Sequence, residues 1–274
     1  MARIAWREVG VGLIVPAVVI AVWQLVAQKG WVNPQVLPSP LAVVTKWIEY
    51  LLPLQARDVA GGQSWLAWAL SGELIHDSLG SLYRVVVGFL IGGGLALPIG
   101  LAMGASARFY AWLNPLVQLL RPIPPIAYIP LSILWFGLGN PPAVFLIALG
   151  AFFPVLMNTI AGVRHVDGIY LRAARNLGAS GITLFVRVIL PAAVPYILSG
   201  VRIGIGTAFI VVIVSEMIAV NNGLGFRILE AREYFWSDKI IAGMITIGMI
   251  GLAIDIIMNR INNYLLRWHR GLEN

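Results

Sequence analysis

Six long apolar stretches limit what this chain can fold into more than any other feature of its sequence. They cover roughly residues 9–27, 85–105, 112–136, 141–163, 193–219 and 240–258. A helix needs about 20 mostly apolar residues to cross the hydrocarbon core of a bilayer. A transmembrane β-barrel would instead alternate apolar and polar residues. The stretches therefore predict an all-α polytopic membrane protein with about six transmembrane helices.

Composition excludes the other broad classes of protein. The 274 residues are 59% hydrophobic and 11% charged, whereas soluble domains are about 45–50% apolar and about 25% charged. Such hydrophobicity also excludes a disordered chain. The sequence has no cysteine, which excludes disulfides, thiolate catalysis and cysteine metal sites. Its three scattered histidines form no metal-binding or catalytic motif, which argues against an enzyme.

The net charge of +7 predicts how the chain is oriented. Basic loops of membrane proteins face the cytoplasm and anionic lipid, and no nucleic-acid-binding motif accompanies them here. With the N-terminus inside, the inner loops carry Arg3, Arg7, Arg108, Arg164, Arg172, Arg175, Arg187, Arg260, Arg267 and Arg270. The outer loops carry only Lys29, Lys46, Arg57, Arg227, Arg232 and Lys239. We therefore expect both termini to be cytoplasmic, with membrane lipid and not nucleic acid as a partner.

The connections between the apolar stretches carry signals of their own. The sequence Gly137-Leu138-Gly139-Asn140 predicts a tight hairpin between the third and fourth stretches. Ahead of the second stretch we expect a short amphipathic helix over Leu41–Leu52, an exposed loop over 55–64 and a short helix over Gly72–Arg84. The first stretch imitates a signal peptide, but it is long for one and lacks a clear cleavage site. We therefore expect a retained helix there.

The inner loop from His165 to Pro195 is long and amphipathic. Its arginines occupy polar positions, and its apolar side is formed by Leu171, Ala174, Leu177 and Leu184. Gly178 is expected to break the loop into two short helices, the second of which Pro191 stops. A surface helix lying at the membrane interface, with no partner protein, would also fit these features.

The spacing within this loop indicates more than a surface helix. Ala173-Ala174 is followed by Gly178 four residues later and then by Leu190-Pro191. This pattern resembles the EAA motif of ATP-binding-cassette importer permeases, which runs E-A-A-x3-G-x9-I-x-L-P. Arg172 stands where the family has Glu. The change removes an acidic group from that position and leaves the helix–turn–helix shape intact.

Other segments extend the resemblance over about residues 30–268. They are LPSP at 37–40, LLRPIPPIAYIPLSILWFGLG at 119–139, NTIAGVRHVD at 158–167, PYILSGVRIGIG at 195–206, SEMIA at 215–219 and NGLGFRILEAREY at 222–234. These segments look like the branch of the family that takes up aliphatic sulfonate, taurine, nitrate and bicarbonate, and the version at 119–139 is most similar to sulfonate and taurine permeases. The resemblance implies a type I importer permease (MetI-like) fold in a bacterial inner membrane.

The resemblance also implies how the chain is organised. It gives an N-terminal transmembrane helix at 1–30, a periplasmic segment with short amphipathic helices at 31–84, a permease core of five transmembrane helices at 85–260 and a cytoplasmic tail at 261–274. Within the core, a coupling loop at about 163–191 would seat in a groove of an ATPase subunit. The coupling residues would be Leu171, Arg172, Ala173, Ala174, Arg175, Leu177, Gly178, Leu190 and Pro191.

The chain carries no nucleotide-binding motif of its own. A P-loop requires Gly-Lys-Ser/Thr, and none of the three lysines follows a glycine. We therefore expect no cofactor in this chain, with ATP and Mg²⁺ bound by separate ABC nucleotide-binding ATPase subunits. The resemblance further implies a second permease copy and a periplasmic or lipid-anchored solute-binding protein.

Charged residues and prolines inside the apolar stretches are candidates for the solute path, because charge at membrane depth is costly and broken helices are tolerated only beside protein or water. We expect the path to include Arg121, Pro122, Pro124, Pro125, Asn158, Arg202 and Glu216. A guanidinium matches an oxyanion geometrically, so Arg121 would attract a sulfonate or nitrate oxygen. Alternatively, Arg121 pairs with Glu216 or caps free carbonyls, and Arg202 reaches the inner interface. Glu216 would then be a structural partner or a contact for the solute-binding protein.

Three pairs of glycines at four-residue spacing, which begin at Gly88, Gly100 and Gly200, predict close helix packing.

Together the sequence predicts the permease subunit of an ATP-driven importer that moves a small anion by alternating access. Aliphatic sulfonate or taurine is favoured as the solute, and nitrate or bicarbonate is the alternative. A stand-alone secondary transporter is the alternative from a different class. It would have broken helices in two related halves, whereas the Pro-rich break occurs once in this sequence.

Overall fold

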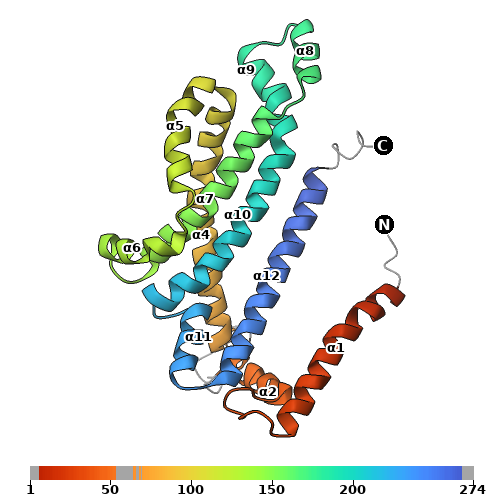
Figure 1. The fold of residues 1–274 in the computed structure, drawn as a ribbon, viewed down its shortest axis with the longest axis vertical. Coiled ribbons are helices and arrows are strands. Elements are labelled where there is room, and N and C mark those ends of the chain that lie inside the picture. The colour runs from red at the N-terminus through yellow and green to blue at the C-terminus, as the bar shows by residue number, and fades with distance from the viewer. Residues whose placement is uncertain (1–5, 54–63, 66–67, 69, 267–274) are drawn as a thin grey trace. The chain divides into compact units, whose positions relative to one another are not determined.

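The structure is a computed structural model that describes residues 6–53, 64–65, 68 and 70–266 (Figure 1). Every regular element in these residues is helical, which confirms the expected fold class. The α-helices are α1 (Trp6–Gln28), α2 (Pro40–Leu51), α4 (Glu73–Ala105), α5 (Ala107–Leu120), α6 (Ile129–Phe136), α7 (Asn140–Arg164), α8 (Gly168–Asn176), α9 (Gly181–Leu184), α10 (Leu190–Ala219), α11 (Leu224–Glu233) and α12 (Ser237–Leu265). A 3-10 turn, η1 (Pro125–Tyr128), and a π-turn, η2 (Phe185–Ile189), complete them.

Four helices in the described part of the chain are long and apolar enough to cross a membrane. They are α4, α7, the continuous helix Gly181–Ala219 and α12. A fifth span is counted if α5 and Pro125–Phe136, which are bent by 82° from each other, cross the membrane together. The first predicted stretch lies in α1, where Ile14–Gln28 qualifies only as a shorter apolar helix. By this measure the described residues supply four or five of the expected six spans.

Local sequence signals fix several helix ends. The Ser39 hydroxyl accepts the N–H of Ala42 at 3.2 Å, and Pro40 occupies the first position of α2, as expected of an N-cap followed by proline. The helix predicted over Leu41–Leu52 is thereby confirmed. The short helix predicted over Gly72–Arg84 is instead the start of α4, because no proline separates it from the next apolar stretch. Most of the loop predicted over 55–64 lies outside the described residues.

The predicted hairpin between the third and fourth apolar stretches is also confirmed. Gly137 and Gly139, which separate α6 from α7, have φ angles of 75° and 119°. Residues with a Cβ rarely adopt these angles.

The chain divides into two units by its internal contacts. Unit 1 comprises Met1–Ser78 and Arg227–Gly248, and unit 2 comprises Leu79–Phe226 and Met249–Asn274. Helices α4, α11 and α12 each contribute residues to both units.

An ion-pair network holds part of unit 1 together. The Arg227 guanidinium of α11 lies 2.7 Å from the Glu73 carboxylate, 2.8 Å from that of Asp77 and 2.8 Å from that of Glu230. Asp77 also accepts the Tyr50 hydroxyl of α2 at 2.8 Å. Burial, joined by the negative charge of Asp77, raises the pKa of the Tyr50 phenol far above its usual range. The phenol therefore stays protonated and keeps this hydrogen bond.

Helix α7 forms the centre of unit 2. It lies side by side with α10 (Figure 1), and spaced glycines let both α4 and α10 approach it closely. A Cβ added at Gly92 of α4 would lie 2.0 Å from the Ala148 carbonyl oxygen of α7. A Cβ added at Gly200 of α10 would lie 2.7 Å from Cβ of Asn158. The packing role predicted for the glycine pairs is confirmed, because any other residue would force these helices apart.

Helix α5 packs against the same core. A buried cluster joins α4, α5 and α7 through Ala96, Met103, Val117, Val155, Leu156 and Ile160. The valine, leucine, isoleucine and methionine side chains each contribute about 1.5–3 kcal/mol when they are fully buried. The cluster therefore fixes the end of α5, from which the proline-rich break leads to η1 and α6.

Candidate coupling loop and solute path

Helix α8 and the turn that follows it form the tip of the predicted coupling loop. At the end of α8, the N–H of Ala179 donates to the Ala174 carbonyl and the N–H of Gly178 donates to the Arg175 carbonyl, both at 2.9 Å. These two bonds define a Schellman motif, with Gly178 in the left-handed region at a φ of 85°. The predicted break at Gly178 is therefore confirmed, and its geometry is fixed by hydrogen bonds.

Pro191 does not stop the second helix of the loop, contrary to the prediction. Helix α9 continues through η2 into α10, so that one helix runs from Gly181 to Ala219. Pro191 lies in the first turn of α10, immediately after a π-turn that changes the hydrogen-bond spacing. The loop tip is consequently joined to a membrane helix without a flexible connection.

Two large apolar side chains are exposed beside the turn. Leu177 is 89% exposed and Ile182 is 82% exposed. The prediction that Leu177 shares an apolar side with Leu184 is wrong, because Leu184 is buried while Leu177 lies beyond the last helical residue of α8. The 3.6-residue period does not apply after a helix ends. Exposed aliphatic side chains at a rigid turn are typical of a surface that contacts another protein.

The outer face of α8 is small and basic. Ala173, Arg172 and Arg175 are exposed, whereas Leu171 and Ala174 are half-buried. Neither arginine forms an ion pair or a side-chain hydrogen bond within the part of the chain that the structure describes. The tip can therefore offer two guanidinium groups to an acidic surface.

A cavity of about 360 Å³ lies beside the broken helix in unit 2. Its wall includes four residues of the predicted solute path, Arg121, Pro124, Pro125 and Asn158, together with Ile123, Gly150, Pro154, Ile203 and Thr207. Pro122, although predicted with them, is not part of this wall. Thr159, which adjoins Asn158, is fully buried. The proline-rich break thus brings its own backbone and the Arg121 side chain to the wall of this cavity.

Arg121 is the one charged residue among the described residues that line this cavity. Its side chain is exposed and makes no hydrogen bond or ion pair within the described chain. The Thr207 hydroxyl donates to the Ile203 carbonyl at 2.9 Å, and the Asn158 amide donates one N–H to the Pro154 carbonyl at 2.9 Å. The donors left for a solute are therefore the Arg121 guanidinium and the second N–H of Asn158.

Arg202 does not line this cavity. Its guanidinium lies 2.7 Å and 3.0 Å from one carboxylate oxygen of Asp255 in α12, and both side chains are 46% exposed. The pair connects α10 to α12 within unit 2. The structure thus provides Arg202 with a counter-ion that the sequence pattern did not identify.

Glu216 belongs to a buried polar cluster that lies apart from the cavity wall. Its carboxylate accepts hydrogen bonds from the Arg84 guanidinium at 2.5 Å, the Ser81 hydroxyl at 2.9 Å and the Gly225 N–H at 3.0 Å. Glu216 is fully buried and Arg84 is 2% exposed. The alternative in which Arg121 pairs with Glu216 is therefore wrong. The reading of Glu216 as a structural partner agrees with this arrangement.

Arg84 is the member of this cluster that sequence reasoning missed. It donates to the Asn140 side chain at 2.7 Å and to the Asn222 carbonyl at 3.2 Å, besides the Asn222 side chain. In sequence it lies just before an apolar stretch and looks like an ordinary flanking charge. The available signal was Glu216 itself, since a carboxylate inside an apolar helix requires a cation nearby.

The chain is similar to transport proteins along most of its length. The family described as "binding-protein-dependent transport system inner membrane component" matches residues 94–271. A protein of Bacillus subtilis named as an aliphatic sulfonates transport permease, SsuC, is 38% identical over 99% of this chain and 91% of its own length. The taurine transport system permease protein TauC of Escherichia coli is 34% identical over 97% of this chain and 94% of its own length.

A solved structure shows a similar fold. It is an inward-facing conformation of the MetNI methionine ABC transporter, with a TM-score of 0.64 and 18% sequence identity. The match covers 74% of this chain and 99% of the matched chain. The MetI-like fold expected from the sequence is thereby confirmed.

Proposed function

Because this chain belongs to the family of inner membrane components of binding-protein-dependent transport systems, we propose that it is the permease subunit of an ATP-driven importer for an aliphatic sulfonate. The similarity to SsuC and TauC supports this class of solute. The observation that carries the coupling to an ATPase is the fixed turn at Gly178, with the exposed side chains of Leu177 and Ile182 beside it.

The coupling surface is the tip of the loop formed by α8 and its Schellman turn. Leu177 and Ile182 insert into an apolar groove of the ATPase subunit, where their exposed area is removed from water. Arg172 and Arg175 meet acidic groups at the edge of that groove, since they are exposed and have no partner in the described chain. The continuous helix from Gly181 to Ala219 then carries the motion of the ATPase into the membrane.

The solute passes the cavity at the proline-rich break, where Arg121 contacts the anion. A sulfonate has three oxygens that accept hydrogen bonds, and a guanidinium presents parallel donors to two of them. The second N–H of Asn158 is available for a further bond. Arg121 has no acidic neighbour among the described residues of the cavity wall, so the anion does not compete with a fixed carboxylate there.

ATP and Mg²⁺ bind to partner subunits, and this chain responds to them through the coupling loop. Two permease copies and two ATPase subunits form the complex, and a solute-binding protein delivers the anion from outside. Both termini of the permease are cytoplasmic, as the distribution of arginines indicates. Closure of the ATPase subunits by ATP favours the outward-open permease, and hydrolysis restores the inward-open state.

The first test is association of the permease with the ATPase encoded beside it. The two proteins are expressed together and purified through a tag on the permease. Leu177→Asp is expected to lose most of the bound ATPase, because it places a carboxylate in an apolar contact. Leu177→Met is the matched control and is expected to retain the ATPase, because it preserves volume and hydrophobicity. Equal retention by both variants would refute the assigned contact.

The second test identifies the solute. The complex is reconstituted in liposomes with its binding protein, and uptake of labelled taurine is measured with and without ATP. Unlabelled alkanesulfonates are expected to compete, whereas nitrate and bicarbonate are expected not to. Competition by nitrate or bicarbonate would assign the same machinery to those anions. Uptake by the permease alone, without ATPase or ATP, would establish a secondary transporter.

A further inference from the structure

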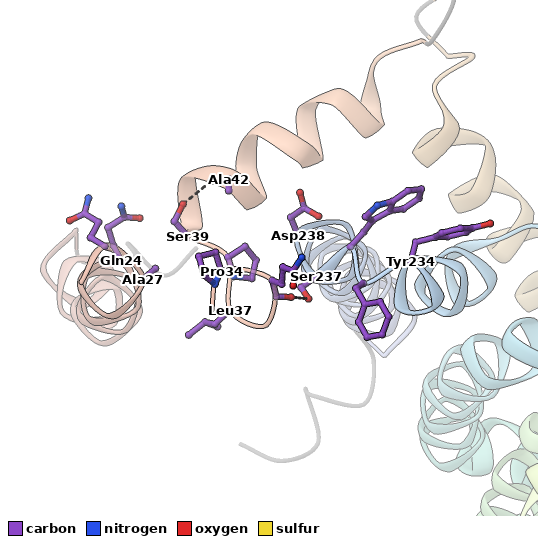
Figure 2. A pocket seen from close by; sticks show the side chains of 14 residues that line it. Gln24, Ala27, Pro34, Leu37, Ser39, Ala42, Tyr234, Ser237 and Asp238 are labelled. Atoms are coloured by element: carbon purple, nitrogen blue, oxygen red, sulfur yellow. Dashed lines mark hydrogen bonds between the residues drawn. The ribbon is translucent and has the colours of Figure 1, made fainter. Parts of the chain in front are cut away.

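A cavity in unit 1 lies outside the solute path. It has a volume of about 700 Å³ and lies between the end of α1, the segment from Pro34 to Ser39 and the turn from α11 to α12. Figure 2 shows side chains from all three: Gln24 from α1, Leu37 from the connecting segment, Tyr234 from the turn after α11 and Asp238 from the start of α12.

Hydrogen bonds hold the segment between α1 and α2 on both sides of this cavity. The Trp23 indole N–H of α1 donates to the Pro38 carbonyl at 3.0 Å. On the other side, the Ser237 hydroxyl at the start of α12 donates to the Gln35 carbonyl. The walls are thus tied together by specific contacts.

The turn from α11 to α12 is held in a strained conformation at the cavity wall. The N–H of Trp236 donates to the Ala231 carbonyl at 2.8 Å and the N–H of Phe235 donates to the Arg232 carbonyl at 3.2 Å. This is a Schellman motif in which Phe235, at a φ of 58°, takes the place usually held by glycine. Phe235 is the one non-glycine residue with positive φ in the described chain and is 79% exposed. An exposed phenyl ring maintained at a cost in backbone energy points to a ligand or a surface that it contacts.

Within the described chain, the lining contains one carboxylate that has no ion pair and side-chain amides that make no hydrogen bond. Asp238 is the one charged residue among the described residues that line the cavity. Its carboxylate accepts the N–H of Lys239 at 2.8 Å but forms no ion pair in the described chain. The side-chain amides of Gln24 and Gln28 make no hydrogen bond there either. The cavity therefore offers an acceptor for a cation on its α12 side and donors for an anionic oxygen on its α1 side.

The lysines near the cavity, Lys46 and Lys239, are already paired. A hollow that shares Ser39 and Asp238 with this cavity also includes Lys46 and Glu49, which pair with each other at 3.0 Å. Lys239 points elsewhere, since its ammonium lies 3.1 Å from Glu73 and over the Tyr50 ring. Among the described residues, no lysine or arginine lines the cavity, so a purely anionic ligand would meet only the charge of Asp238 there.

The cavity lies beside the ends of two apolar helices. Helix α12, which is long and apolar enough to cross a membrane, begins at Ser237, and α1 ends at Gln28. Helix α1, which carries the two glutamines, also exposes Val18, Val22 and Leu25, each by more than half of its surface. An acyl chain can lie along this apolar face while its headgroup occupies the polar cavity.

We propose that this cavity binds the headgroup of a phosphatidylethanolamine-type lipid. The ammonium donates to Asp238, the phosphodiester oxygens accept from the amides of Gln24 and Gln28, and an acyl chain lies on the exposed face of α1. Phe235 and Tyr234 contact the glycerol region, as aromatic residues do at membrane interfaces. Free taurine shares the chemistry of a primary ammonium two carbons from an oxyanion, but it has no acyl chain for the apolar face of α1. The lipid site does not depend on which solute the permease carries.

The test measures lipid retention by the permease–ATPase complex. The complex is stripped of lipid in detergent, mixed with phosphatidylethanolamine or phosphatidylglycerol, and examined by native mass spectrometry. The wild type is expected to retain phosphatidylethanolamine in preference to phosphatidylglycerol. Asp238→Asn is expected to weaken phosphatidylethanolamine binding about tenfold, since one charge-assisted hydrogen bond becomes neutral. Glu233→Gln, which removes an exposed carboxylate from the same turn, is the matched control and is expected to bind like the wild type.

Three results would overturn the proposal. The first is equal retention of the two lipids, and the second is unchanged phosphatidylethanolamine binding in Asp238→Asn. The third is displacement of the bound lipid by excess taurine, which would make the cavity a solute site. If Asp238→Asn reduces docking of the solute-binding protein and leaves lipid retention unchanged, the cavity belongs to that protein instead.

Discussion

The buried pair formed by Arg84 and Glu216 gives the sharpest prediction for stability. Arg84→Met removes the cation and leaves a carboxylate that is fully buried. Glu216 would keep only the hydrogen bonds from Ser81 and Gly225, which cannot compensate a full charge. Removal of one partner from a buried ion pair costs about 3–5 kcal/mol. For a chain of this size that corresponds to a fall in Tm of about 6–20 °C.

The second half of this prediction is a double-mutant cycle. Glu216→Gln combined with Arg84→Met leaves no unpaired charge, and replacement of both members of a buried pair is often close to neutral. We therefore expect the double variant to recover at least about 2 kcal/mol relative to the sum of the single variants. The glutamine can still accept from Ser81 and Gly225, which keeps the start of α11 in place.

The assay is thermal unfolding of the full-length permease in complex with its ATPase. Unfolding is monitored by intrinsic fluorescence, and the protein that remains folded after heating is measured by gel filtration. Lys46→Ala is the control, because the pair of Lys46 with Glu49 is exposed and such pairs contribute about 0–1 kcal/mol. Additive losses in the double variant would refute the reasoning. So would a loss from Arg84→Met no larger than that from Lys46→Ala.

Four further substitutions test individual steps of the argument. Gly92→Ala should destabilise by about 3 kcal/mol because of its contact with a main-chain oxygen, whereas Gly94→Ala, which meets no atom within 4 Å, should be neutral or stabilising in the same melt. Arg121→Gln should raise the KM for sulfonate uptake about tenfold while basal ATPase activity is unchanged, and an unchanged KM would remove Arg121 from the path. Gly178→Val should uncouple ATPase activity from uptake, since a β-branched residue is strained at positive φ, whereas Gly178→Asn should remain coupled. Phe235→Gly should raise the free energy of unfolding by about 1 kcal/mol, and a decrease would show that the turn is unstrained.

The candidate site was predicted in part because some of its features are local. The turn at Gly178 follows from one glycine at the end of a short amphipathic helix, and hydrogen bonds within a few residues complete it. The proline-rich break likewise follows from residues 122–130, where prolines remove helix donors. By contrast, the error at Pro191 arose because a proline reads as a stop unless the preceding π-turn is known.

The sequence by itself determined most of the segments that are long and apolar enough to cross a membrane, and the turns at Gly137–Asn140 and Gly178. Hydrophobic length and periodicity are properties of consecutive residues, and spaced glycines mark the faces that can approach. The tertiary structure decided which charges meet. Arg84 and Glu216 are 132 residues apart, and Arg202 and Asp255 are 53 apart. Helix packing decides which partners Glu216 and Arg202 have and why Arg121 has none in the described chain. It fixes how far apart the side chains lie and how deeply they are buried, and no local sequence pattern encodes these two quantities.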